Sequence, residues 1–389
     1  MKYNFDEIID RRNTNAVKLE RCKALFGTDD LLPLWVADMD FRTPDFILDA
    51  LQQRLDHPIL GYTLPPNNLF DVFIAWVKEH HQWKLNSKQV GFIPGVVPGL
   101  ALTVQCFTSP NDEIIVQPPV YYPFFNVINN NGRKLVYNPL RVENNKHAMD
   151  FEDLEQKITP ATKMLILCNP HNPGGRVWSL DTLKRLDEIC AKHKILVISD
   201  EIHADMVFSG NQHIPFASVA ETAALNSITF MAPSKVFNIA GLISSFYMIP
   251  NQTLMNKFVA HLAASEVKGS NIFAYQATVA CYDKGNDWRV AMLAYVQGNI
   301  DYVVNYLKEH IPQIKPMIPD ASFLVWLDCG KLGMESDELH QFFAHKAGLG
   351  LNKGATFGPG GEDYLRMNVA CPRKVLEQAM QQLKNALSV

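Results

Sequence analysis

The chain has 389 residues, 47% of them hydrophobic and 20% charged, with a formal net charge of -4 and a pI of about 6.3. This composition is that of an ordinary globular protein, and the absence of any basic stripe excludes nucleic acid and anionic membranes as expected partners. The N-terminal stretch MKYNFDEIIDRR has acidic residues where a signal peptide needs an apolar core, and no apolar run reaches about 18 residues, so we expect a cytoplasmic protein.

The cysteines are dispersed along the chain. No two of them form a CxxC pair, and none has a histidine at zinc-ligand spacing; they are Cys22, Cys106, Cys168, Cys190, Cys281, Cys329 and Cys371. An odd, scattered set predicts reduced core thiols and no metal site.

The first two thirds of the chain alternate between strands and helices. Residues 91–107, GFIPGVVPGLALTVQCF, indicate a strand, a glycine turn and a helix beginning near Pro98. Continuously apolar strands are predicted at 113–119, 163–170, 195–201, 227–233 and 242–249, and a helix with Ser179 as its N-cap is predicted at 180–193. Strands of this kind are typical of a parallel sheet that is covered on both faces.

From about residue 288 the pattern contains more helix and fewer strands. We expect a helix at 288–311, a strand at 322–329, a helix after Ser336, a strand at 364–371 and a last helix from Pro372. The sequence therefore predicts a large domain over 46–287 and a smaller α+β domain made of 1–45 and 288–389.

Polar residues follow three of the predicted strands. Asn172 lies in the turn of CNPHNPGGRVW, Asp200 ends ILVISDE, and Lys235 lies in the apolar stretch FMAPSKVFNIAGL. A turn asparagine, a helix-capping aspartate and a snorkelling lysine would explain each residue separately. Because ligands bind outside the carboxyl ends of parallel strands, we expect all three side chains in one crevice.

The order and spacing of these motifs resemble the fold-type I, aminotransferase-like enzymes that use pyridoxal phosphate. The chain is most similar to the MalY/PatB branch of cystathionine β-lyases, or C-S lyases. The resemblance rests on LPLWVADMDF (32–41), GY (61–62), PPVYYPFF (118–125), NPHNPGGRVW, SDEIHADM, SKVFNIAGL and LRMNVACP (365–372). It implies an α/β, PLP-dependent transferase-like fold, with a mainly parallel seven-stranded sheet in the large domain, and a homodimer.

The resemblance also implies roles around the cofactor ring. Lys235 would link to pyridoxal phosphate and act as the base at the substrate Cα, while Asp200 would keep the ring nitrogen protonated. Asn172 would bind the ring hydroxyl and the substrate. Tyr121 would stack on the ring and is expected, with Lys235, among the catalytic residues. His203 belongs to the SDEIH motif of the same branch and is expected among the cofactor-binding residues.

Other residues are expected at the phosphate and at the substrate carboxylate. The amides of Val96 and Val97 would face the phosphate at a helix N-terminus, with Ser234 adding a hydroxyl. By resemblance, Tyr62 would reach the phosphate from the neighbouring subunit. Arg366 would clamp the substrate α-carboxylate, which the backbone near Ala37 would meet from the other side.

Three positions depart from typical transaminases. Ile243 stands where many have a phosphate-binding arginine, His203 where many have a tyrosine, and Ala232 where a phosphate-binding serine is common. The first two differences favour the lyase branch, and the third leaves the phosphate with fewer side-chain donors.

The predicted reaction is a β-elimination from cystathionine or a related S-substituted cysteine, giving a thiol, pyruvate and ammonia. A thiol with a pKa near ~8.5 departs without a dedicated acid. An amino-acid aminotransferase would share every cofactor residue, and a MalY-like protein with an added regulatory, protein-binding role also stays open. The sequence does not choose among sulfur amino acids.

Overall fold

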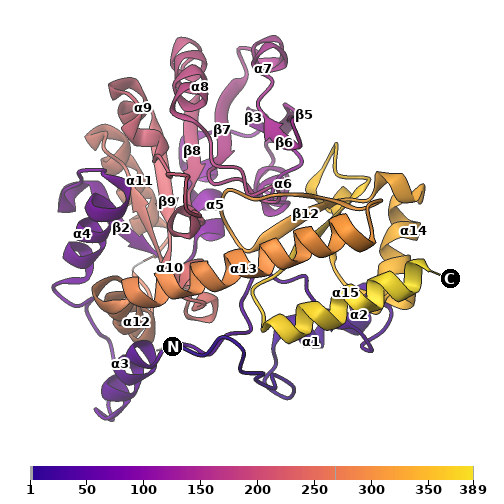
Figure 1. The fold of residues 1–389 in the computed structure, drawn as a ribbon. Coiled ribbons are helices and arrows are strands. Elements are labelled where there is room, and N and C mark those ends of the chain that lie inside the picture. Colours follow the sequence, from indigo (N-terminus) through magenta and orange to yellow (C-terminus); the bar gives the residue numbers. More distant parts are fainter. Residues whose placement is uncertain (1–2, 268, 389) are drawn as a thin grey trace.

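A seven-stranded sheet forms the centre of the larger part of the molecule (Figure 1). The computed structural model describes residues 3–267 and 269–388. In spatial order the strands are β2 (Val90–Ile93), β10 (Ser245–Met248), β9 (Ser227–Met231), β8 (Leu196–Asp200), β7 (Thr162–Cys168), β3 (Glu113–Val116) and β4 (Lys134–Tyr137). The expected mainly parallel, seven-stranded sheet is therefore confirmed.

Both faces of this sheet are buried, which explains the continuously apolar strands. Along β3, Ile114 and Val116 pack into one cluster while Ile115 packs into another, because successive side chains point to opposite faces. The first cluster includes side chains of α5 (Val96–Phe107), α6 (Pro123–Asn129) and α11 (Gln252–Ala264). The second includes side chains of α7 (Phe151–Lys157), α8 (Leu180–Lys192) and α9 (Glu221–Leu225).

Helix α8 forms as its sequence predicts. Its leucines at 183 and 186 are buried, and the hydroxyl of Ser179 accepts a hydrogen bond of 3.2 Å from the Thr182 amide at the N-terminus. The cap satisfies one of the free first-turn donors. The helix therefore begins where expected and ends one residue earlier than predicted.

Strand β10 differs from the prediction in direction and start. The segment 242–249 was expected as one more parallel strand, but the strand begins at Ser245 and runs antiparallel to both β9 and β2. It follows the short helix α10 (Pro233–Val236) and a turn at Ala240–Leu242. An apolar run reports burial on both faces and carries no information about direction, so periodicity could not reveal this reversal.

A second sheet lies beside the first and is wholly antiparallel. Its strands are β11 (Lys315–Met317), β12 (Leu324–Asp328), β15 (Tyr364–Asn368) and β14 (Asn352–Lys353), in that order. The helices of this region are α13 (Asn286–His310), α14 (Ser336–Gln341) and α15 (Arg373–Leu387). Figure 1 shows α13 running across the molecule from the side of α12 to the side of β12. The helices and strands predicted after residue 288 are confirmed within a few residues.

The N-terminal segment joins the two parts. Strand β1 (Leu32–Pro33) pairs in parallel with β13 (Leu349–Gly350). The segment also contains α1 (Val17–Glu20), α2 (Cys22–Phe26), α3 (Asp45–Leu55) and α4 (Leu69–His81), and α12 (Ile272–Lys284) packs against α3 and α4. The division at residues 46 and 287 stays a prediction.

A small two-stranded hairpin follows β4 along the chain. The hairpin consists of β5 (Arg141–Glu143) and β6 (Lys146–Ala148).

The seven cysteines are free, and all but Cys106 are buried. Within the part of the chain that the structure describes, none of the helices combines the length and the apolarity that crossing a bilayer requires.

Candidate active site

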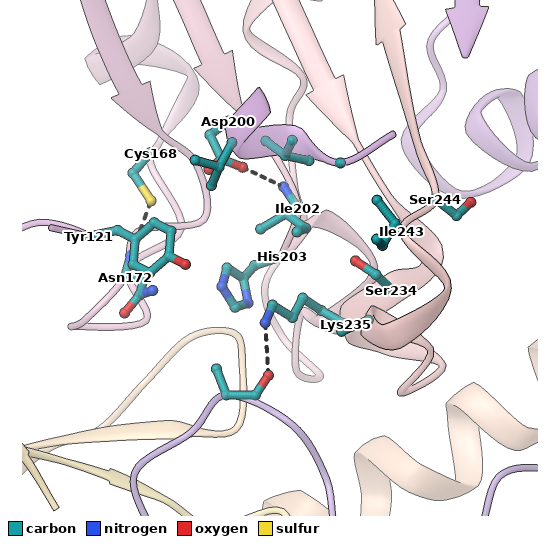
Figure 2. A pocket seen from close by; sticks show the side chains of 15 residues that line it. Tyr121, Cys168, Asn172, Asp200, Ile202, His203, Ser234, Lys235, Ile243 and Ser244 are labelled. Carbon is teal, nitrogen blue, oxygen red and sulfur yellow. Dashed lines mark hydrogen bonds between the residues drawn. The ribbon is translucent and has the colours of Figure 1, made fainter. Parts of the chain in front are cut away.

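The carboxyl ends of neighbouring strands open into one cavity of about 180 Å³ (Figure 2). Strand β7 ends at Cys168, β8 ends at Asp200, and α10 follows β9 with Lys235 in its last turn. Most of the predicted site residues line this cavity: Ala37, Val96, Val97, Tyr121, Asn172, Asp200, His203, Ser234 and Lys235. The convergence expected from the strand ends is therefore present.

The Lys235 side chain points into the cavity, and the pKa of its amine is lowered. Its Nζ donates a hydrogen bond of 2.8 Å to the carbonyl oxygen of Ala37, which Figure 2 marks with a dashed line. Burial, followed by the positive charge of Arg366, lowers the pKa of the Lys235 amine to about 8. With such a pKa about a tenth of the amine is neutral at pH 7, far more than for an ordinary lysine, and this neutral form can act as a nucleophile or a base.

Asp200 is a buried carboxylate, and within the part of the chain that the structure describes no cation is in direct contact with it. The Ile202 amide donates to its Oδ1 at 3.1 Å, and the side chain is 3% exposed. Burial, opposed by that hydrogen bond, raises the pKa of Asp200 to about 7. A positively charged N–H group in the cavity would favour the charged carboxylate, which is what a protonated pyridine ring offers.

His203 and Tyr121 both line the cavity and are both uncharged. In Figure 2 the His203 ring lies between Asn172 and Lys235. Burial, with the charges of Lys235 and Arg366, lowers the pKa of His203 to about 3. Burial also raises the pKa of the Tyr121 phenol to about 12. Both rings are therefore neutral at physiological pH.

Arg366 adjoins the cavity through Asn172. Its Nη1 donates to Asn172 Oδ1 at 2.9 Å, and its Nη2 donates to Asn352 Oδ1 at 2.6 Å and to the Trp35 carbonyl at 3.1 Å. Burial lowers the pKa of Arg366 to about 10. The guanidinium is 4% exposed and has only neutral acceptors in the residues described, so an anion such as a carboxylate would complete its coordination.

Arg366 and Lys235 both contact one irregular segment, residues 35–39. The Ala37 carbonyl accepts from Lys235 and the Trp35 carbonyl from Arg366, while the Val36 and Asp38 carbonyls both accept from Asn368. The predicted contact of the Ala37 backbone with a substrate carboxylate stays a prediction. Only the amide groups of this segment could provide it, because the carbonyls would repel an anion.

The N-terminus of α5 forms another wall of the cavity. The helix begins at Val96, two residues before the predicted start near Pro98, because Gly95 precedes it with a φ of 103° that favours glycine. Val96 and Val97 therefore lie in the first turn, where amides have no intrahelical acceptor. Ser234 is 8% exposed and lies on the same cavity, so these three groups are available donors for an anion.

Arg366 and Tyr62 are the predicted site residues that do not line this cavity. Arg366 hydrogen-bonds Asn172, which does line it, whereas no such contact joins Tyr62 to the lining within the residues described. Tyr62 is fully exposed, in the irregular stretch between α3 and α4. Ile59, Leu60 and Leu64 in the same stretch are also exposed. A contact between Tyr62 and the phosphate would therefore need a second copy of the chain.

Cys168, Ile202 and Ser244 also line the cavity, although they were not among the predicted residues. Cys168 ends β7 beside Asp200 in the sheet register, and its Sγ accepts from the Asn172 amide at 3.3 Å. The strand-end argument that selected Asp200 could have selected this residue. Ser244 follows the unusual Ile243, with a hydroxyl bonded to Thr278, and no sequence pattern marks it.

Together these groups fit pyridoxal phosphate. A buried carboxylate lies at one end for the ring nitrogen, an amine of lowered pKa for the aldehyde, and an aromatic ring beside them. The first turn of α5 and Ser234 offer donors to a phosphate in place of the arginine and serine that the sequence lacks.

The chain resembles known proteins over its whole length. The family model for aminotransferase class I and II matches residues 29–383. Cystathionine β-lyase PatB of Bacillus subtilis is 44% identical, covering 99% of this chain and 100% of that protein, and protein MalY of Escherichia coli is 30% identical, covering 99% of each. The solved structure of the PLP-bound C-S lyase from Staphylococcus hominis is 36% identical, with a TM-score of 0.92 and coverage of 100% of this chain and 98% of that chain.

Proposed function

The chain belongs to the aminotransferase class I and II family, and from that membership we propose a pyridoxal-phosphate-dependent carbon–sulfur β-lyase. It cleaves cystathionine or a related S-substituted cysteine to a thiol, pyruvate and ammonia. The observation that carries the proposal is the convergence of Lys235, Asp200, Asn172 and Arg366 in a chain similar to named C-S lyases.

Substrate binding is assigned to Arg366 and Asn172. Arg366 lies on β15 with two guanidinium nitrogens oriented by Asn172, Asn352 and the Trp35 carbonyl. A guanidinium fixed in this way binds a carboxylate with charge-assisted hydrogen bonds and little loss of entropy. The α-carboxylate is therefore held on the Asn172 side of Lys235.

Proton transfer is assigned to Lys235. Bound pyridoxal phosphate supplies an electron sink that stabilises negative charge at the substrate Cα. The neutral Lys235 amine removes the Cα proton, and Asp200 maintains a positive charge at the far end of the cavity by charge pairing. His203 and Tyr121 are neutral and buried, so they shape the cavity and exclude water without adding charge.

The phosphate is assigned to the donors at α5 and to a second subunit. The amides of Val96 and Val97 and the hydroxyl of Ser234 hold it within one chain. A homodimer in which Tyr62 crosses the interface accounts for the exposed apolar stretch 59–64, which a monomer would leave in water. We place the enzyme in the cytoplasm.

The decisive experiment measures colour and product together. We expect purified protein to show a visible cofactor absorption band, and to release pyruvate from cystathionine without a keto-acid acceptor. Amino-group transfer to 2-oxoglutarate without pyruvate release would instead make the protein an aminotransferase. A colourless protein that cannot be reconstituted with pyridoxal phosphate would overturn the proposal.

A further inference from the structure

A second and larger cavity begins at the catalytic lysine. It has a volume of about 680 Å³ and shares Ala37, Lys235 and Ala240 with the cofactor cavity. Its other lining residues come from the N-terminal segment and from the turn after α10, and Asp200 is not among them. If the smaller cavity holds the cofactor, as the proposed function requires, this larger space is what remains for the substrate side chain.

One wall of the larger cavity carries a compact ion cluster. Arg11 contacts Asp38 at 2.6 Å and Asp40 at 2.7 Å, and Lys18 contacts Asp40 at 2.8 Å and Asp38 at 3.4 Å. Two cations and two carboxylates leave the cluster without net charge. Because each group already has close partners of opposite sign, the cluster has little remaining attraction for a charged ligand.

Arg42 differs from that cluster. It lines the same cavity, but within the residues described its ionic contact is with Asp45, at 3.8 Å from Nε to Oδ1, and both side chains are exposed. That distance is longer than a hydrogen bond. Within the residues described, the Arg42 guanidinium makes no side-chain hydrogen bond, so its donors are available to a ligand in the cavity.

Apolar side chains line the same cavity as Lys235 and Arg42. Ile9, Val17 and Leu48 line the cavity, and each of them is more than a third exposed. Such a wall accommodates methylene groups, whereas a terminal charge requires a polar partner. Among the described residues, the lining therefore combines these apolar side chains with Arg42, a cation without a close carboxylate partner.

We infer that this cavity receives the sulfur-bearing half of the substrate, and that Arg42 is a specificity-determining residue that binds a carboxylate on that half. The inference rests on the proposed lyase function for the position of the reacting carbon. It adds a preference that the cofactor residues do not set, because none of them faces the distal end of the substrate. Uncharged S-alkyl groups enter the same space without using Arg42.

Three substrates of nearly equal length test the charge preference. S-(2-carboxyethyl)-L-cysteine, S-propyl-L-cysteine and S-(2-aminoethyl)-L-cysteine carry a negative, a neutral and a positive end. We expect kcat/KM of the wild-type holoenzyme for the carboxyethyl compound to exceed that for the propyl compound by about tenfold, as one charge-assisted hydrogen bond would give. The aminoethyl compound should be the poorest of the three.

Substitution of Arg42 identifies the group responsible. Arg42→Ala should remove the carboxyethyl preference and leave the propyl compound within about twofold of wild type, mainly through KM. Arg42→Glu should invert the order in favour of the aminoethyl compound. Arg185→Ala, which removes an exposed arginine from α8 outside the cavity, is the matched control and should change none of the ratios.

A binding measurement separates this inference from the proposed reaction. Calorimetric dissociation constants for the three compounds, measured in the Lys235→Ala background, report the same ratios without turnover. A ratio that depends on Arg42 supports the subsite whether or not the wild-type enzyme releases pyruvate. Equal ratios in the presence and absence of Arg42 overturn the inference, even if the lyase activity itself is confirmed.

Discussion

Arg366 donates a hydrogen bond of 2.9 Å to Asn172, although 194 residues separate the two positions along the chain. Arg366 belongs to the four-stranded sheet, and Asn172 lies in the turn after β7 of the seven-stranded sheet. The bond fixes the Arg366 guanidinium, which we propose binds the substrate carboxylate, relative to Lys235 and Asp200. The active site therefore depends on how the two sheets pack.

Replacement of Arg366 by lysine tests the carboxylate contact. Arg366→Lys keeps a positive charge but loses the planar pair of donors, so we expect kcat/KM for cystathionine to fall about 100-fold, mostly through KM. Steady-state kinetics measure the effect. Arg141→Lys, on the exposed strand β5, serves as the control. A fall in kcat alone, with KM unchanged, would contradict a role in binding the substrate.

Removal of the lysine amine tests the proton-transfer step. We expect Lys235→Ala to lower kcat at least about 10³-fold, because no other amine lines the cofactor cavity within the residues described. Loss of the wild-type visible absorption band should accompany the loss of pyruvate release. Lys184→Ala on α8 should behave as wild type. Retention of more than a tenth of the activity in Lys235→Ala would contradict the assignment.

The raised pKa of Asp200 predicts how the stability of the cofactor-free protein depends on pH. The folded protein holds the Asp200 proton up to a pKa of about 7, whereas the unfolded chain releases it near 3.8. The stabilisation from this group is therefore complete below pH 3.8 and is lost as the pH rises through about 7, by up to ~4 kcal/mol.

Asp200→Asn isolates that contribution. The cofactor-free variant should be more stable than the cofactor-free wild type at pH 8, by urea denaturation, and the difference should shrink toward pH 4. In the holoenzyme we expect the protonated ring nitrogen of the cofactor to favour the charged form of Asp200, which removes this loss of stability. Asp200→Asn should therefore bind the cofactor more weakly. A difference in stability that does not vary with pH would show that Asp200 is ionised in the cofactor-free fold.

Tyr62 tests the contribution of a second subunit. Because the side chain is fully exposed in one chain, Tyr62→Ala should leave the fold of each subunit intact. If its hydroxyl reaches the phosphate of a neighbouring subunit, Tyr62→Ala and Tyr62→Phe should both weaken cofactor binding about tenfold. Absorbance titration with pyridoxal phosphate measures the affinity, and sedimentation velocity measures the oligomer. Unchanged affinity in both variants would exclude the crossed contact.

Local patterns predicted the elements of the site more accurately than their arrangement. Ser179 marked the start of α8 because a cap acts within one turn, and Asp200 and Lys235 were found because strand ends of a wound sheet meet at one edge. The start of α5 was predicted two residues too late, because Pro98 marked the first turn more clearly than Gly95, which precedes the helix. The antiparallel direction of β10 had no local signal at all.

The sequence alone determined the chemical groups and their order along the chain: a lysine in an apolar turn, an aspartate and an asparagine at the ends of successive strands, and a match to one family over residues 29–383. Only the tertiary structure decided that Lys235 bonds the Ala37 carbonyl, that Asn172 orients Arg366, and that Arg42 shares a cavity with the lysine. Motifs arise from contacts within a turn or a strand, which residue type and spacing encode. Contacts between distant segments depend on the packing of whole sheets and helices, which no short pattern records.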